Sequence, residues 1–127
     1  MNTVVIGLGS NIDPAANIEK ARTILTQKFR VLAESPFIKT KPLGPKKQPH
    51  FLNGAVLAVT NLGYDTLRAE LKTIEKSLGR TNSVKNFAPR TIDLDILVWN
   101  NKIIDPDFYQ RDFLKKSVLQ LIPDLHY

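Results

Sequence analysis

The stretch of this chain that could do chemistry runs from Arg90 to Val98 and contains two aspartates, Asp93 and Asp95, with one residue between them. In a β-strand, successive side chains point to opposite faces, so both carboxylates would share one face. Two negative charges this close raise a pKa or require a cation. The pattern favours a divalent cation such as Mg²⁺, which one or two carboxylates and phosphate oxygens hold together. An edge strand with a solvated acidic face explains the two aspartates equally well.

Three further residues could bind a ligand. Arg90, directly before the two aspartates, carries a planar guanidinium that suits phosphate. Phe51 and Asn53 lie two residues apart in an apolar run, so both would point to one face of a strand. An Asn on a buried face needs a hydrogen-bonding partner, which favours a bound ligand over a core Phe beside a strand defect.

The spacing of apolar residues predicts the elements that must position these side chains. It indicates strands over residues 4–8, 31–39, 51–60 and 90–99, and helices from residues 13–14, from 64–65 and over 113–121. Asp13 and Asp65 are expected to cap the first two helices, and Gly79 to end the second. Pro36 indicates an edge position or a bulge.

The order strand–helix–strand–strand–helix–strand, followed by a short last helix, predicts an α+β fold of the ferredoxin-like βαββαβ type. The antiparallel sheet would have helices on one face and leave the other face to loops and ligands. With no repeat and no linker, residues 1–127 are expected to form a single domain. Two polar loops, over residues 40–50 and 80–89, are long enough to suggest functional segments.

Composition excludes several classes of protein. The chain has no cysteine, which rules out disulfides and thiolate metal sites. It has no basic leader before an apolar run and no apolar stretch that could span a bilayer, so a cytoplasmic location is expected. The net charge of +6 suits polyanions in general and does not choose among them. Gly7-Leu8-Gly9 lacks the third glycine of a dinucleotide-binding turn, so we reject that interpretation.

Taken together, the motifs resemble the 6-hydroxymethyl-7,8-dihydropterin pyrophosphokinase family over nearly the whole chain. The most specific segment is P-R-T-I-D-L-D-I at residues 89–96. The others are G-S-N at 9–11, T-K-P-L-G-P at 40–45, F-L-N at 51–53 and G-R at 79–80. The resemblance implies a ferredoxin-like enzyme of folate biosynthesis, an ATP-dependent transferase. It moves the terminal pyrophosphoryl group of ATP to a pterin alcohol and releases AMP.

The resemblance also implies roles for residues around ATP. Asp93 and Asp95 would hold two Mg²⁺ ions that bridge the ATP phosphates, and which aspartate assists removal of the hydroxyl proton stays open. Arg80 and Arg90 would clamp phosphates as part of the catalytic set. Taken alone, Arg80 would read as a solvated residue just past a helix end. The remaining residues expected to contact or support the nucleotide are Arg111, Glu75 and Ile96.

A pterin site follows from the same resemblance. Phe51 and Phe113 would stack on the two faces of the pterin ring. Asn53 and Thr40 would read its amide-like edge, together with backbone groups near Leu43. Phe87 would close over the ring.

The chain departs from the family at three points. Asn82 stands where the family often has an arginine, and Phe87 replaces a common tryptophan. The segment between Phe108 and Arg111 is short and lacks the family's histidine for ATP phosphates. A weakly active or inactive pterin- or nucleotide-binding homologue is therefore one alternative. An RNA-binding ferredoxin-like domain is the other, although the chain has no RNP-type aromatic strand. We expect a monomer that binds small molecules and neither nucleic acid nor membrane.

Overall fold

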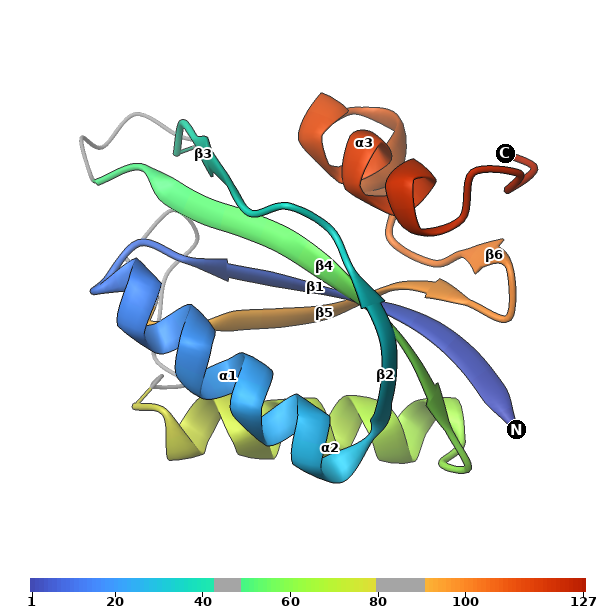
Figure 1. The fold of residues 1–127 in the computed structure, drawn as a ribbon, viewed down its shortest axis with the longest axis horizontal. Helices are drawn as coiled ribbons and strands as arrows, with labels where there is room; N and C mark the ends of the chain where they lie inside the picture. Colours follow the sequence, from blue (N-terminus) through green and yellow to red (C-terminus); the bar gives the residue numbers. More distant parts are fainter. Residues whose placement is uncertain (43–48, 80–90) are drawn as a thin grey trace.

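Figure 1 shows the fold of this protein as a computed structural model, which describes residues 1–42, 49–79 and 91–127. In chain order the elements are β1 (Asn2–Ser10), α1 (Pro14–Lys28), β2 (Arg30–Glu34), β3 (Ile38–Thr40), β4 (Phe51–Thr60), α2 (Tyr64–Ser77), β5 (Asp93–Trp99), β6 (Lys102–Ile103), the 3₁₀ helix η1 (Pro106–Tyr109) and α3 (Asp112–Leu121).

The strands form one antiparallel sheet in the order β2-β4-β1-β5-β6, with β3 paired to β4. Without the short strands, the spatial order β5-β1-β4-β2 and the element order βαββαβ are those of a ferredoxin-like fold. The predicted fold class is therefore confirmed. No helix within the described ranges is both long and apolar enough to cross a membrane.

Helices α1 and α2 cover one face of the sheet (Figure 1). The main core lies between them and the sheet and contains alternate residues of β1, β4 and β5, such as Ile6, Val56 and Leu94. Leu25 of α1 and Leu71 of α2 are almost fully buried against this face. Burial of this apolar stripe, rather than helix propensity, gives such short helices most of their stability.

The opposite face, called here the α3 face, is partly covered by α3 and η1, so the expectation of a face left to loops and ligands is only partly right. A second apolar cluster lies there and includes Val5, Leu97, Phe108 and Val118. Val5 and Leu97 of the sheet give one end of the α3 face an apolar surface, which Phe108 of η1 and Val118 of α3 cover. Only the other end of this face is left for polar side chains.

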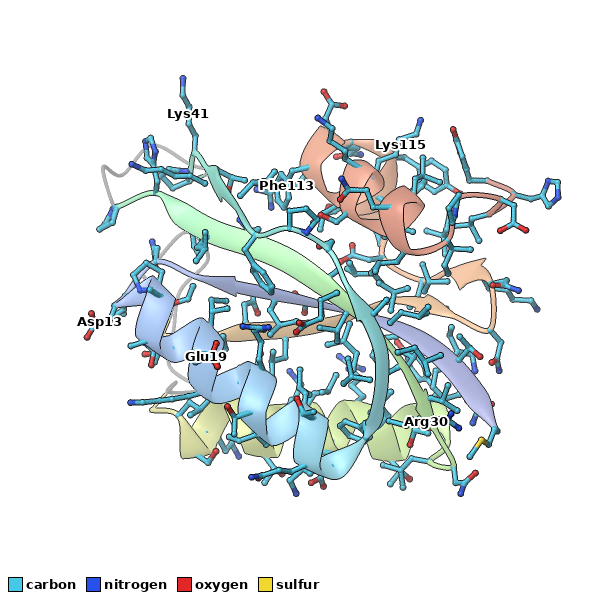
Figure 2. The ribbon with its side chains drawn as sticks, viewed as in Figure 1. Asp13, Glu19, Arg30, Lys41, Phe113 and Lys115 are labelled. Atoms are coloured by element: carbon cyan, nitrogen blue, oxygen red, sulfur yellow. The ribbon has the colours of Figure 1, made fainter. Side chains whose placement is uncertain are left out.

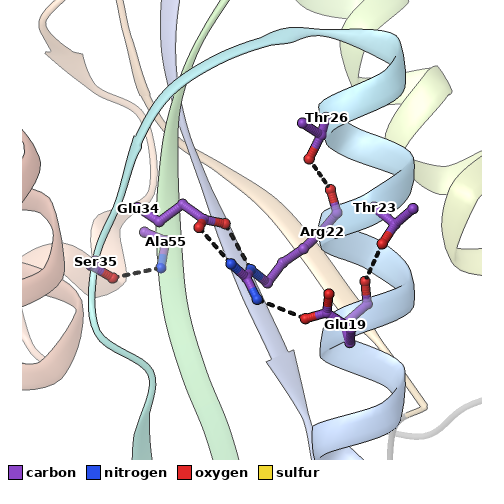
Figure 3. Close-up of polar contacts among 7 residues, drawn as sticks. All are labelled: Glu19, Arg22, Thr23, Thr26, Glu34, Ser35 and Ala55. Carbon is purple, nitrogen blue, oxygen red and sulfur yellow. Dashed lines mark hydrogen bonds and ion pairs between the residues drawn. The ribbon is translucent and has the colours of Figure 1, made fainter.

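The strand predicted over residues 31–39 is two strands, because the chain breaks at Ser35 and Pro36. Pro36 has no N–H to donate to a ladder. Ser35 bridges the break, since its N–H donates to the Ala55 carbonyl and its hydroxyl accepts from the Ala55 N–H, both at 2.8 Å. Figure 3 shows the bond between the Ala55 N–H and the Ser35 hydroxyl, together with the Arg22 guanidinium, which donates to both carboxylate oxygens of Glu34 and ties α1 to β2.

Of the two predicted helix caps, Asp13 is confirmed as the N-cap residue, although without a side-chain bond, and Asp65 is wrong. Asp13 is the N-cap of α1 but lies in the left-handed region with φ of 44°, and its side chain makes no capping bond. Gly63, not Asp65, is the N-cap of α2, which places Asp65 in the first turn, where the helix dipole still favours its charge. Gly79 follows α2 with φ of 99°, as predicted for a glycine that ends a helix.

Candidate functional site

Two rows of residues cross the α3 face beside the second apolar cluster, and the second row includes Ala55 of that cluster. In the first row, Gly9 of β1 lies between Asn53 of β4 and Asp93 of β5. In the second row, Gly7 of β1 lies between Ala55 and Asp95. Residues paired across antiparallel strands point to the same face. The prediction that both carboxylates share one face is therefore confirmed, and Asn53 shares that face with them.

The two aspartates differ in exposure, because Asp93 is half-buried and Asp95 is exposed. Same-face residues of a strand lie about 7 Å apart. Within the described ranges, no three acidic or histidine side chains form a possible metal-binding group. Two carboxylates fit Mg²⁺, which commonly takes one or two protein carboxylates and completes its shell with phosphate oxygens and water.

Asn53, Thr40 and Phe51 come together through the pairing of β3 with β4. Thr40 lies opposite Phe51, two residues from Asn53 on the same face. The Asn53 Nδ2 donates to Thr40 Oγ1 at 2.5 Å. Its Oδ1 lies over Gly9, so close that a Cβ on Gly9 would overlap it. The amide is thus held by Thr40 at its nitrogen, and its oxygen occupies the space that a side chain on Gly9 would need.

Phe113 and Arg111 lie at the start of α3. Arg111 is the N-cap of this helix, and its guanidinium carbon is 4.4 Å from the centre of the Phe113 ring, a cation–π distance. Figure 2 labels Phe113 at the end of α3 nearest β3 in that view. Burial lowers the pKa of Arg111, against the opposing charges of Asp107, Asp105 and Asp93. An arginine stays charged despite such a shift.

The short segment before Arg111 is a single turn. The N–H groups of Gln110 and Arg111 both donate to the Asp107 carbonyl, at 3.0 and 2.9 Å. The chain therefore passes from η1 directly into α3.

Asp105 is a neighbour of Asp93 that sequence reasoning missed. It caps η1, since its Oδ1 accepts from the Asp107 N–H at 2.9 Å. Burial raises its pKa, and the charges of Asp107 and Asp93 add to the effect. The Asp-Pro dipeptide at the start of η1 was a local signal for the cap. The proximity of Asp105 to Asp93 depends on tertiary packing, which no local sequence pattern indicates.

Glu75 and Ile96 are separated from the aspartates by the sheet, although both were expected among the nucleotide-contacting residues. Glu75 is 6% exposed and accepts from the Leu94 N–H at 2.7 Å, on the helix side. Ile96 belongs to the helix-side core. Glu75, on the helix that covers the other face, thus forms a hydrogen bond with the backbone of the residue between the two aspartates. Four predicted site residues, Leu43, Arg80, Phe87 and Arg90, lie outside the described residues, as does Asn82.

Comparison with known proteins gives one consistent match. Residues 5–123 match the family model described as 7,8-dihydro-6-hydroxymethylpterin-pyrophosphokinase. A 2-amino-4-hydroxy-6-hydroxymethyldihydropteridine pyrophosphokinase of Haemophilus influenzae is 33% identical over 136 residues, covering 98% of this chain and 84% of the relative. The protein of the same name in Pseudomonas aeruginosa is 35% identical, with 96% and 82% covered. A mitochondrial folate synthesis bifunctional protein of Pisum sativum is also 35% identical, although the match covers only 25% of that longer protein.

Proposed function

Because this chain belongs to the 7,8-dihydro-6-hydroxymethylpterin-pyrophosphokinase family, we propose that it is an ATP-dependent pyrophosphokinase of folate biosynthesis. It transfers the pyrophosphoryl group of ATP to the hydroxymethyl group of 6-hydroxymethyl-7,8-dihydropterin and releases AMP. The hydroxyl oxygen of the pterin forms a bond to the β-phosphorus. The bond from the β-phosphorus to the oxygen shared with the α-phosphate breaks, and the hydroxyl proton is lost.

The observation that carries this proposal is the row Asn53–Gly9–Asp93 on the α3 face. It puts an amide that can donate and accept a hydrogen bond across β1 from Asp93, on the same face as both carboxylates. Asn53 and Thr40 would read the pterin edge, with Phe51 and Phe113 against its ring faces. The pterin's hydroxymethyl group would then point along the row toward β5, where Asp93 and Asp95 lie.

Asp93 and Asp95 would hold Mg²⁺, and we propose two ions. Bound there, the metal neutralises charge on the transferred group and aligns attacking and leaving oxygens. Asp93, the less exposed carboxylate, is on the row that leads to the pterin site.

Cationic side chains would hold the phosphates. Arg111 lies near Asp93 and Asp105 and has its guanidinium stacked on Phe113. From their positions in the family's motifs, Arg80 and Arg90 would clamp phosphates too. Phe87 would cover the pterin, and the backbone near Leu43 would bind its edge. We also propose that residues 1–127 act as one domain and as a monomer.

The proposal is tested by incubating the purified protein with ATP, Mg²⁺ and 6-hydroxymethyl-7,8-dihydropterin and measuring AMP by chromatography. The variants Asp93→Asn and Asp95→Asn should each lower turnover by about 100-fold or more, because each removes a charge that balances the phosphates. Asp65→Asn is the matched control, since this exposed aspartate lies on α2, on the helix side of the sheet. A wild-type protein that makes no AMP would overturn the proposed activity. Full turnover in either aspartate variant would overturn the metal site.

A weakly active homologue is the second candidate, and the single turn between η1 and Arg111 is the observation that favours it. This turn leaves no room for the family's histidine-bearing segment. Calorimetry of the binding of a non-hydrolysable ATP analogue, set against turnover, separates the two candidates. Tight nucleotide binding with slow turnover supports the weakly active homologue, and efficient turnover removes it.

A salt-titrated RNA shift assay tests the RNA-binding alternative, which the two aspartates on the open sheet face disfavour.

A further inference from the structure

Gly9 lies in the centre of the candidate site, on the middle strand of the sheet. Its neighbours across the ladder are Asn53 on one side and Asp93 on the other. A side chain at this position would stand between the amide that would read the pterin and the first metal-binding carboxylate.

The space that a side chain of Gly9 would occupy is filled by the Asn53 amide. Asn53 Oδ1 is the nearest atom to the position of a Cβ on Gly9, and the two would overlap. The Nδ2 of the same amide donates to Thr40 Oγ1 on β3. The amide therefore spans from β3 to β1, with its oxygen directed over β1. One proton of Nδ2 and a lone pair of Oδ1 stay available for a ligand edge.

Other glycines of the sheet are covered differently. Gly7 has the terminal atoms of Leu97 above it, 3.0–3.3 Å from an added Cβ, and Gly54 has the Phe37 ring. At these two positions the cover is apolar packing. At Gly9 the cover is a polar group of the candidate site itself.

We infer that Gly9 is a positioning residue for pterin recognition, and this inference rests on the proposed function. Its lack of a Cβ lets the Asn53 amide lie across β1 in the orientation that Thr40 sets. A methyl group at position 9 would push Oδ1 away, rotate the amide and break its alignment with both Thr40 and the pterin edge.

The first test is steady-state kinetics of Gly9→Ala. Loss of one aligned hydrogen bond should raise the KM for the pterin by about tenfold. The KM for ATP should change by less than about twofold, because the proposed function assigns the amide to the pterin and not to the nucleotide. Gly7→Ala is the matched control: it adds the same methyl group on the same strand and face but meets Leu97. An equal rise in both KM values for Gly9→Ala, or no rise in the pterin KM, would overturn the inference.

A double-mutant cycle with Asn53→Ala isolates the mechanism. In the Asn53→Ala background there is no amide to displace, so Gly9→Ala should have little further effect on pterin binding, measured by calorimetry. If Gly9→Ala weakens binding by the same factor in both backgrounds, Gly9 acts through something other than Asn53, and the inference fails.

A readout without substrate separates this inference from the proposed function. The side-chain amide resonances of Asn53 in an ¹⁵N spectrum should shift in Gly9→Ala and in Thr40→Val, and should stay in place in Gly7→Ala. If the wild-type protein makes no AMP but these shifts occur, the proposed function fails. The inference that the orientation of the Asn53 amide depends on Gly9 then still holds. Resonances that do not move in Gly9→Ala overturn the inference whatever the activity.

Discussion

Asp105 is an acidic neighbour of the candidate metal-binding residue Asp93. It is half-buried, caps η1 and adds negative charge close to Asp93. Burial is the largest cause of its raised pKa, and the hydrogen bond from the Asp107 N–H and the attraction to Arg111 only partly offset that rise. Asp105 therefore costs stability when it is ionised.

Asp105→Asn should stabilise the protein at pH 7. The amide keeps an oxygen that can accept from the Asp107 N–H and removes the charge. The folded-state pKa lies above the unfolded value, so the folded protein binds the proton more tightly. The ionised carboxylate destabilises the folded protein fully at pH values above the folded-state pKa. This destabilisation disappears as pH falls toward the unfolded-state pKa of about 3.9.

Thermal unfolding of the wild type and Asp105→Asn across this pH range checks the prediction. The difference in Tm should be largest near neutral pH and should shrink on acidification. Asp107→Asn is a control at an exposed neighbour. A lower Tm for Asp105→Asn at pH 7, or a difference independent of pH, would contradict it.

At the scale of elements, Glu75 ties α2 to the start of β5. Its carboxylate accepts from the Leu94 N–H and comes from α2, the helix on the sheet face opposite the aspartates (Figure 1). Hydrogen bonds to buried charged groups are stronger than neutral ones, and breaking one leaves a backbone donor without this acceptor. The position of Asp93 and Asp95 therefore depends on a residue that does not share their face.

Glu75→Ala should lower the free energy of unfolding by about 2 kcal/mol, and turnover should fall because the start of β5 loses its support. Glu70→Ala is the control on the same helix: its pair with Lys28 is more exposed and should contribute less than about 1 kcal/mol. Urea unfolding followed by circular dichroism measures both. Equal losses in the two variants would show that Glu75 has no special role.

The ion pair between the Arg22 guanidinium and the Glu34 carboxylate joins α1 to β2 (Figure 3). It should make the stability of the protein depend on pH. Hydrogen bonding from Arg22 lowers the pKa of Glu34 below its ordinary value. A lowered carboxyl pKa gives stability that is present above the unfolded pKa and is lost as pH falls through the folded pKa.

Glu34→Gln should therefore lower Tm slightly at pH 7, and wild type and variant should converge in acid. The effect should stay small, because both side chains are about one-third exposed. Thermal melts at several pH values check this, and a difference that grows in acid would contradict it.

At the scale of the whole molecule, the sheet has two cores, one under α1 and α2 and one under α3 and η1. Phe108 is among the largest side chains of the second core and is 1% exposed. Because α3 carries Arg111 and Phe113, the second core positions one side of the candidate site.

Phe108→Ala should destabilise the protein by about 3–5 kcal/mol. Hydrogen exchange should show greater loss of protection in α3 than in β1 or α2, and the KM for the pterin should rise. Tyr109→Ala, at a neighbouring aromatic that is 63% exposed, serves as the control. Uniform loss of protection in all elements would show that the two cores unfold as one unit.

Much of the fold was predictable because apolar periodicity is a local property of the sequence. The strand predicted over residues 51–60 matches β4, and the shared face of Asp93 and Asp95 follows from strand alternation alone. The place of α3 on the second face, the contact of Glu75 with Leu94 and the proximity of Asp105 to Asp93 depend on tertiary packing. No local pattern encodes such contacts.

The interrupted strand pair β2–β3 has a consequence for how this protein behaves among its own copies. This border of the sheet shifts register between Val31 and Ala33, then loses a donor at Pro36. The exposed Leu32 lies between the charges of Arg30 and Glu34. An edge of this kind has no long, regular row of unpaired N–H and C=O groups with which a strand of another molecule could pair. The irregular edge therefore disfavours edge-to-edge aggregation of this small β-rich protein.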